Sequence, residues 1–349
     1  MDVILPIILF SVGLVLIIKG ADWLTEGAAN IAHHYGIPTI VVGLTIVAVG
    51  SSAPEFVVSV ISAIQGNADI ALGNVVGSNI FNILAIMGVT AIVRPIEAAR
   101  NNIKYDIPFL VLANLVIAIT AFDKYFDPMS KGGDCVSRTD GLLMLCMFAI
   151  FMSYTYSIAN STGSATSQSI ADSTNSQGIA GSASSPASAM EAEGTKKGGI
   201  LRSVLFVIVG LVLLVLGGDW LVDGASGIAS LMGISDSIIA LTIVSGGTSA
   251  PELAASVMAA KKGDTAMAVG NIVGSVVFNV FFVLGTAAAI HPLGIAGITV
   301  FDIVYLLGSS VLLWVLCRFG KQHLTLTRTE GWVMVILAVL YYVVLVIKE

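Results

Sequence analysis

Charged residues are scarce in this sequence. Asp, Glu, Lys and Arg together make up 11% of its 349 residues, against about 25% in soluble proteins, and the mean hydropathy is +0.95. So little charge on so apolar a chain is typical of integral membrane proteins. The net charge of −6 comes without a basic tail, so no nucleic-acid partner is expected.

Cysteine and histidine are also few. The three cysteines are odd in number and form no CxxC pair, so neither a disulfide framework nor a cysteine metal site is predicted. The four histidines all lie near expected loops, and no nucleophile with a neighbouring base stands out. The sequence therefore predicts neither an enzyme nor a protein with a resident cofactor.

An internal repeat is the strongest pattern that the chain does contain. Two stretches, GSSAPE at 50–55 and ALGNVVGSNIFN at 71–82, reappear as GGTSAPE at 246–252 and AVGNIVGSVVFN at 268–279. Pairing residues 22–88 with 219–285 without gaps gives about 31 identities in 67 positions, which indicates duplication. The chain is therefore two related halves.

Each half contains five apolar runs of about 20 residues, the length that spans a bilayer. We expect spans at 3–20, 38–64, 68–92, 105–122 and 140–158, and again at 200–217, 236–260, 265–289, 298–317 and 330–347. Because five is odd, the second half must enter the membrane from the opposite side. The predicted fold is an all-α membrane protein of ten transmembrane helices in two inverted-topology repeats of five, with broken helices at the midplane.

The predicted domains are a first five-helix repeat at 1–158, a linker at 159–199 and a second repeat at 200–349. The linker is rich in Ser, Ala, Gly and Thr and has no aromatic residue, so it should be flexible. If the N-terminus is outside, the internal loops hold twelve Lys and Arg and the external loops four. This distribution predicts a cytoplasmic linker and both termini on the extracytoplasmic side of the cell (inner) membrane.

Two acidic residues, Glu55 and Glu252, occupy equivalent positions in the two halves, each within otherwise apolar or small residues. An ionised carboxylate near the middle of a membrane helix costs about 2.5–3.5 kcal/mol, and no Lys or Arg lies in the spans beside them. Pro54 and Pro251 each remove a backbone donor, so both helices should break there and expose carbonyl oxygens. We expect the glutamates to converge on a cation.

Other polar residues are spaced for one helix face. A serine precedes each glutamate by three residues, and the next span of each half carries Asn, Ser and Asn at intervals of four, namely Asn74, Ser78 and Asn82, and Asn271, Ser275 and Asn279. Calcium takes six to eight such oxygen ligands at about 2.3–2.6 Å, whereas zinc or copper favours His or Cys. Asn74 and Asn271 are equally suited to bridging helices by hydrogen bonds, and this alternative stays open.

The doubled motif G-[ST]-S-A-P-E followed by G-N-x-x-G-S-x-x-x-N resembles the α-repeats of the prokaryotic-type sodium/calcium exchangers, in the cation/calcium antiporter superfamily. The likeness covers nearly all of the chain outside the linker. It implies ten helices in two inverted fives, with four ion sites in a central cluster. Carried over by position, the calcium ligands would be Glu55 and Glu252 with the backbone oxygens of Ser51 and Thr248; the sodium ligands Ser52, Ser78, Ser249 and Ser275 with the carbonyls of Ala48 and Ser245; and the central residues Asn82 and Asn279.

The same resemblance implies secondary-active antiport of Na⁺ against Ca²⁺ by alternating access. The potassium-dependent branch carries Asp at the position of Asn279, so exchange independent of K⁺ is the expectation. The expected partners are the transported Ca²⁺ and Na⁺ ions and the lipid bilayer, with a monomer as the working unit. An H⁺/Ca²⁺ antiporter is the alternative, although S-A-P-E in both halves favours sodium coupling. A cation channel is less favoured, because a channel usually builds its filter from several subunits.

Overall fold

The computed structural model of the chain describes residues 4–97, 102–122, 135–174, 199–232, 245–295, 298–320 and 324–348. The elements of the first half are α1 (Ile4–Tyr35), α2 (Thr39–Val42), η1 (Gly43–Val47), α3 (Ala48–Ser51), α4 (Ala53–Ile64), α5 (Ala68–Ile80), η2 (Phe81–Ile86), α6 (Met87–Val93), β1 (Ile96–Glu97), η3 (Asn102–Asp106), α7 (Ile107–Ala121), β2 (Cys135–Val136) and α9 (Arg138–Thr174). Those of the second half are α10 (Ile200–Leu231), α12 (Ser245–Thr248), α13 (Ala250–Lys261), α14 (Thr265–Phe278), η6 (Asn279–Leu284), α15 (Gly285–Ile290), β3 (Leu293–Gly294), α16 (Val300–Phe319), β4 (Thr325–Leu326) and α17 (Arg328–Lys348).

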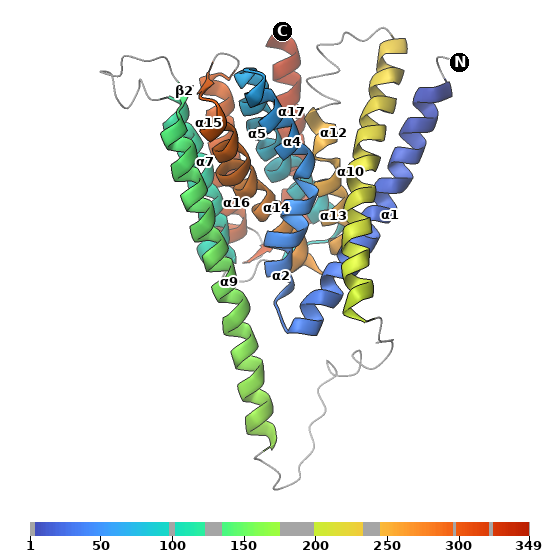
Figure 1. The fold of residues 1–349 in the computed structure, drawn as a ribbon, viewed down its shortest axis with the longest axis vertical. Helices are drawn as coiled ribbons and strands as arrows, with labels where there is room; N and C mark the ends of the chain where they lie inside the picture. The colour runs from blue at the N-terminus through green and yellow to red at the C-terminus, as the bar shows by residue number, and fades with distance from the viewer. Residues whose placement is uncertain are drawn as a thin grey trace.

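The helices lie side by side in one bundle (Figure 1). Within the described ranges, eight helices are long and apolar enough to cross a membrane, and the bent pair Thr39–Ser51 and Ala53–Ile64 makes a ninth if it is counted as one span. The remaining expected span, 236–260, begins outside the described residues, which include its second part as α12 and α13. The chain is therefore a mostly helical integral membrane protein. Figure 1 shows that α1 begins and α17 ends at the same end of the bundle.

Three helices continue further than the apolar runs indicate. α1 and α10 extend to Tyr35 and Leu231, because the acidic residues that follow each run do not interrupt helical hydrogen bonding. α9 continues to Thr174, so the first part of the linker predicted at 159–199 is helical. Serine, alanine and threonine are poor in apolar surface yet compatible with a helix that is already nucleated. Residues 175–198 of the predicted linker lie outside the described residues.

Contacts between the halves occur in matching pairs. Strand β1 pairs antiparallel with β4, and β2 pairs antiparallel with β3, so each two-stranded sheet takes one strand from each half. Likewise α6 packs on α17, and α15 packs on α9. Each of these contacts has a counterpart in which the halves exchange roles, as expected for a duplicated chain.

Glycines let α1 and α10 approach closely. Gly13, Gly20 and Gly27 are seven residues apart and meet Gly217, Gly210 and Ser203 in that order, so the two equivalent helices run antiparallel. A Cβ atom on Gly20 would lie 2.8 Å from the carbonyl oxygen of Gly210. The backbones therefore touch along this seam, as small residues permit in membrane helices. Figure 1 shows the pair standing at one side of the bundle.

The most deeply buried spans are the equivalent segments Ala68–Val93 and Thr265–Ile290. Of their apolar windows 78% and 83% is buried, against 22% for α1. Every residue from Met267 to Phe281 is buried. The polar stripes of the repeats thus lie in the interior of the bundle, where an unpaired polar atom is costly.

We predict that Gly20→Ala lowers the thermal stability of the purified protein, by about 1–3 kcal/mol from overpacking against α10. Gly308→Ala is the matched control, because Gly308 also lies within a helix but an added methyl group there would meet nothing within 4 Å. That change should be neutral or slightly stabilising, since alanine favours helix over glycine by about 1 kcal/mol. Melting curves in detergent distinguish the two, and equal melting temperatures would contradict the close seam.

Candidate functional site

Both repeated motifs form a helix break. In the first half, α3 ends and α4 begins at Ser52, whose backbone has φ −83° and ψ 13°. Ser249 separates α12 from α13 with nearly the same angles, φ −89° and ψ 9°. Pro54 and Pro251 lie in the first turn of the following helix, where their missing N–H would have no helical partner in any case. The break expected from the prolines is therefore found one turn before the glutamates.

The two glutamates are brought together by hydrogen bonds that cross between the halves. Ser249 Oγ donates to Glu55 Oε1 at 3.0 Å, and Ser52 Oγ donates to Glu252 Oε1 at 2.7 Å. Both carboxylates are fully buried. Among the described residues, no lysine or arginine pairs with either of them. Each half thus supplies a carboxylate to a serine of the other.

Two asparagines hold the glutamate backbones in place. Asn74 Nδ2 donates to the carbonyl oxygen of Glu55 at 3.1 Å and to Ser59 Oγ at 2.9 Å. Asn271 Nδ2 does the same with Glu252 at 3.2 Å and with its own neighbouring serine. Of the two alternatives left open by the sequence, the structure supports helix-bridging hydrogen bonds for both asparagines.

The remaining stripe residues point polar atoms into the interior without a partner. Glu55 Oε2, Glu252 Oε2, both amide atoms of Asn82, Asn279 Oδ1 and the hydroxyls of Ser78 and Ser275 are all buried, and none has a hydrogen-bond partner among the described residues. Buried polar atoms are almost always paired. A set of unpaired oxygens from both halves, next to two carboxylates, has the chemistry of a site for a hard cation.

Four further residues of the expected ligand set lie at the breaks. Ser51 Oγ donates to Asn271 Oδ1 at 3.2 Å, which links the first break to the second half. The Ala48 carbonyl accepts the Ser52 N–H at 3.0 Å, as in an ordinary helical turn. Thr248 and Ser245 are the last and first residues of α12, and the Ser245 side chain lies outside what the structure describes. All four residues therefore lie in the short helices that end at the breaks, just before the glutamates.

A cavity of about 340 Å³ lies against both breaks. It is lined by Pro54, Val58, Gly218, Asp219, Val222, Asp223, Gly247, Thr248 and Pro251. It contains two acidic side chains from α10 and touches Thr248, next to the Ser249 that binds Glu55. The negative charge of these two side chains would attract a cation to this cavity.

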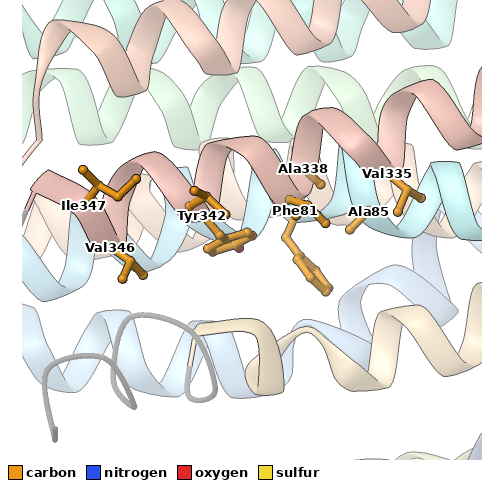
Figure 2. Close-up of a pocket in the computed structure, with 9 residues that line it drawn as sticks. Phe81, Ala85, Val335, Ala338, Tyr342, Val346 and Ile347 are labelled. Carbon is orange, nitrogen blue, oxygen red and sulfur yellow. The ribbon is translucent and has the colours of Figure 1, made fainter. Parts of the chain in front are cut away.

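A second hollow, of about 380 Å³, is of a different kind (Figure 2). It runs along α17 and η2, and its lining is apolar apart from Tyr342. The rings of Phe81 and Tyr342 project into it (Figure 2) and pack edge to face with centroids 6.2 Å apart. This groove offers almost no oxygen ligand and is not a cation site.

Sequence reasoning missed two parts of the site. Ser59 and Ser256 receive the amides of the bridging asparagines; both are serines in otherwise apolar or small turns at equivalent places after their breaks, and only this equivalence could have marked them. Asn79, Asn114 and Ser310 form a buried polar chain behind Asn279. Asn114 is the one amide in the apolar run 107–121, which was the available signal.

Comparisons with known proteins agree with one another. The family model described as "Sodium/calcium exchanger protein" matches residues 5–157 and 202–347. The "Putative antiporter CaxA" of Alkalimonas amylolytica is 35% identical over 93% of this chain and 93% of its own. The "Sodium/calcium exchanger MaX1" of Methanosarcina acetivorans is 28% identical over 97% of both chains. A solved structure of "the sodium-calcium exchanger NCX_Mj", soaked with 10 mM Na⁺ and zero Ca²⁺, has a TM-score of 0.76 and 26% identity over 97% of this chain and 98% of that one.

We predict that calcium raises the melting temperature of the detergent-solubilised protein, because a cation that binds only the folded state stabilises it by about 2.7 kcal/mol at 100 times Kd. Glu55→Gln and Glu252→Gln should each remove most of this shift, since each deletes one buried charge of the site. Glu26→Gln, at an exposed carboxylate on α1, is the control and should keep it. A full calcium shift in either buried variant would argue against a cation between the two glutamates.

Proposed function

The chain belongs to the sodium/calcium exchanger family, and from that premise we propose that it is a secondary-active antiporter exchanging Na⁺ for Ca²⁺ across a membrane by alternating access. The observation that carries the proposal is the pair of buried carboxylates, one from each half, surrounded by buried oxygens that have no partner among the described residues. Such a set can neutralise one calcium ion or take sodium ions in its place, but not both at once.

The proposed ligands follow the geometry of the site. Calcium would take Glu55 and Glu252 with the carbonyl oxygens of Ser51 and Thr248. Sodium would use the hydroxyls of Ser52, Ser78, Ser249 and Ser275 and the carbonyls of Ala48 and Ser245, while Asn82 and Asn279 line the centre. The unpaired buried atoms of six of these residues support the assignment, because cations would satisfy them together.

Exclusive occupancy explains coupling. With the site empty, two carboxylates face each other in a medium of low dielectric, and their repulsion and desolvation oppose the step that changes access. With calcium or sodium bound the charge is offset, and the step can proceed. Transport in one direction therefore requires the return of the other ion.

We also infer ten spans in two inverted repeats of five, with the linker in the cytoplasm and both termini outside. Three observations support this topology: α1 and its equivalent α10 run antiparallel, the contacts between the halves are reciprocal, and the two chain ends lie at the same end of the bundle (Figure 1). An inverted pair that meets at the midplane is the arrangement that permits alternating access.

Potassium is not expected to take part. Asn279, and not a carboxylate, stands in the central stripe, so the cluster carries two negative charges from Glu55 and Glu252. One calcium ion already offsets both charges, so a potassium ion bound with it would add positive charge that the site does not balance. The working unit is expected to be a monomer, because both halves of the site come from one chain.

The decisive measurement is uptake of radioactive calcium by vesicles that contain the purified protein. We expect uptake when the vesicles are loaded with sodium and diluted into sodium-free medium, at a rate that is unchanged when potassium is added or removed. Uptake driven by a pH gradient in the absence of sodium would favour the H⁺/Ca²⁺ alternative. Calcium current without any counter-ion would indicate a channel and contradict antiport.

Replacing either carboxylate should abolish exchange. We predict that Glu55→Gln and Glu252→Gln each reduce sodium-driven calcium uptake by at least about 100-fold. Each variant lacks one of the two negative charges that offset a bound calcium ion, which weakens calcium binding by several kcal/mol. Asp140→Asn, which changes a carboxylate that caps α9 through Ser137, should retain exchange once corrected for the amount inserted. Parent rates in both glutamine variants would remove the basis of the mechanism.

A further inference from the structure

A chain of buried side-chain hydrogen bonds leads away from Asn279 into the outer part of the bundle. Asn279 Nδ2 donates to Asn79 Oδ1 at 3.3 Å, Asn79 Nδ2 donates to Asn114 Oδ1 at 3.1 Å, and Asn114 Nδ2 donates to Ser310 Oγ at 2.8 Å. Ser310 Oγ in turn donates to the carbonyl oxygen of Leu306 at 2.8 Å. All four side chains are fully buried. The chain connects η6, α5, α7 and α16, and so crosses twice between the halves.

The direction of this chain is fixed at its far end. Two oxygens 2.8 Å apart need a proton between them, and the Leu306 carbonyl has none, so the Ser310 hydroxyl must supply it. Ser310 Oγ is then left as an acceptor, which requires Asn114 to present its NH₂ group to it and its oxygen to Asn79. The same logic passes along the chain from Asn79 to Asn279.

The consequence at the ion site is that the NH₂ group of Asn279 donates its hydrogen bond to Asn79. Its Oδ1 atom is left buried and without a partner among the described residues. A carbonyl oxygen is a cation ligand, whereas an NH₂ group would place partial positive charge in the same position. The orientation of this amide therefore decides whether the residue attracts or repels a cation.

The repeat supplies an internal comparison. Asn114 and Ser310 are themselves equivalent, because Asp106 and Asp302 bind Tyr154 and Tyr341 in the same way at matching distances along α7 and α16. Asn79, in contrast, is equivalent to an apolar residue, Val276. Accordingly Asn82, the counterpart of Asn279, has no such chain, and both of its amide atoms lack partners within the part of the chain that the structure describes.

A purely structural role for Asn79 is the simpler account, but it does not explain the asymmetry. At the equivalent buried position the fold accepts Val276, whose side chain has no polar atom, so packing alone does not require an asparagine there. We propose that Asn79, Asn114 and Ser310 are positioning residues: they hold the Asn279 amide with its oxygen toward the ions and so set the affinity of the central site for sodium. This inference rests on the proposed sodium/calcium exchange.

The binding of sodium should depend on Asn279 Oδ1 more than the binding of calcium does. One calcium ion is balanced by the two glutamates, whereas the sodium ions that replace it are monovalent and spread over more positions. They rely more on neutral oxygens such as the Asn279 carbonyl. We call the hydrogen-bonded chain of Asn79, Asn114 and Ser310 the relay. Its loss is therefore expected to weaken the binding of sodium more than that of calcium.

The first test is Asn79→Leu, which keeps the volume of the side chain but removes the acceptor for Asn279. In sodium-driven calcium uptake we expect the half-saturating sodium concentration to rise roughly tenfold, while that for calcium changes by less than about threefold. In an Asn279→Ala background the relay has nothing to orient, so Asn79→Leu should cause no further change. Equal shifts in both backgrounds would overturn the inference, because a structural role acts in either one.

A second test removes the anchor and is matched for shape. Ser310→Thr keeps the hydroxyl, and Ser310→Val replaces it with a methyl group, so both variants carry the same added carbon. We expect the valine variant to need more sodium than the threonine variant by a similar factor, and identical sodium dependence would overturn the proposal. This pair decides the question if Asn79→Leu does not fold. A parent protein without sodium-driven uptake would overturn both the proposed function and the relay, whereas normal exchange in the parent with equal variants overturns the relay alone.

Discussion

Two buried carboxylates without a basic partner among the described residues are the constraint on which the rest of this structure depends. Desolvating a single charge costs several kcal/mol even after relaxation, and here two like charges are brought together from opposite halves. Each carboxylate has one oxygen bound by a serine of the other half and a second oxygen that no described residue contacts by a hydrogen bond. That division leaves the two second oxygens buried without a hydrogen bond from any described residue, and the proposed cation site depends on this feature.

Breaks in the helices and hydrogen bonds to the backbone position the two glutamates. The breaks at Ser52 and Ser249 release the chain from regular helix one turn before each carboxylate, while Asn74 and Asn271 tie the glutamate backbones to the neighbouring helix. Just beyond, both halves widen into π-helix, at Phe81–Ile86 and Asn279–Leu284. Single wide turns of this kind are frequent at functional sites, because they turn side chains out of the regular helical stripe.

Much of this was available from the sequence because the duplication repeats most of the local patterns around the site. Glu55, Pro54 and the stripe from Asn74 to Asn82 each have a counterpart, so a pattern that is weak once becomes strong when it occurs twice. What could not be predicted depends on contacts across the bundle. Spacing places Ser52 on the face of Glu55, yet its hydroxyl binds Glu252. The end of α9 was misplaced for a related reason, since composition reports the loss of apolar surface and not the end of the helix.

Equivalent residues in the two halves nevertheless make different contacts, and this difference bears on alternating access to the glutamates. Asp22 on α1 pairs with Lys262 at 2.6 Å, at the end of α13. Its counterpart Asp219 lines the cavity beside the breaks. The residue equivalent to Lys262 is Gln65, which is uncharged and cannot form the same ion pair with Asp219. α1 packs closely on α13, whereas the cavity lies between α10 and α4. The two related halves are therefore held in unlike arrangements, with an ion pair between α1 and the end of α13 and a cavity between α10 and α4, and such a difference between equivalent halves is what alternating access requires.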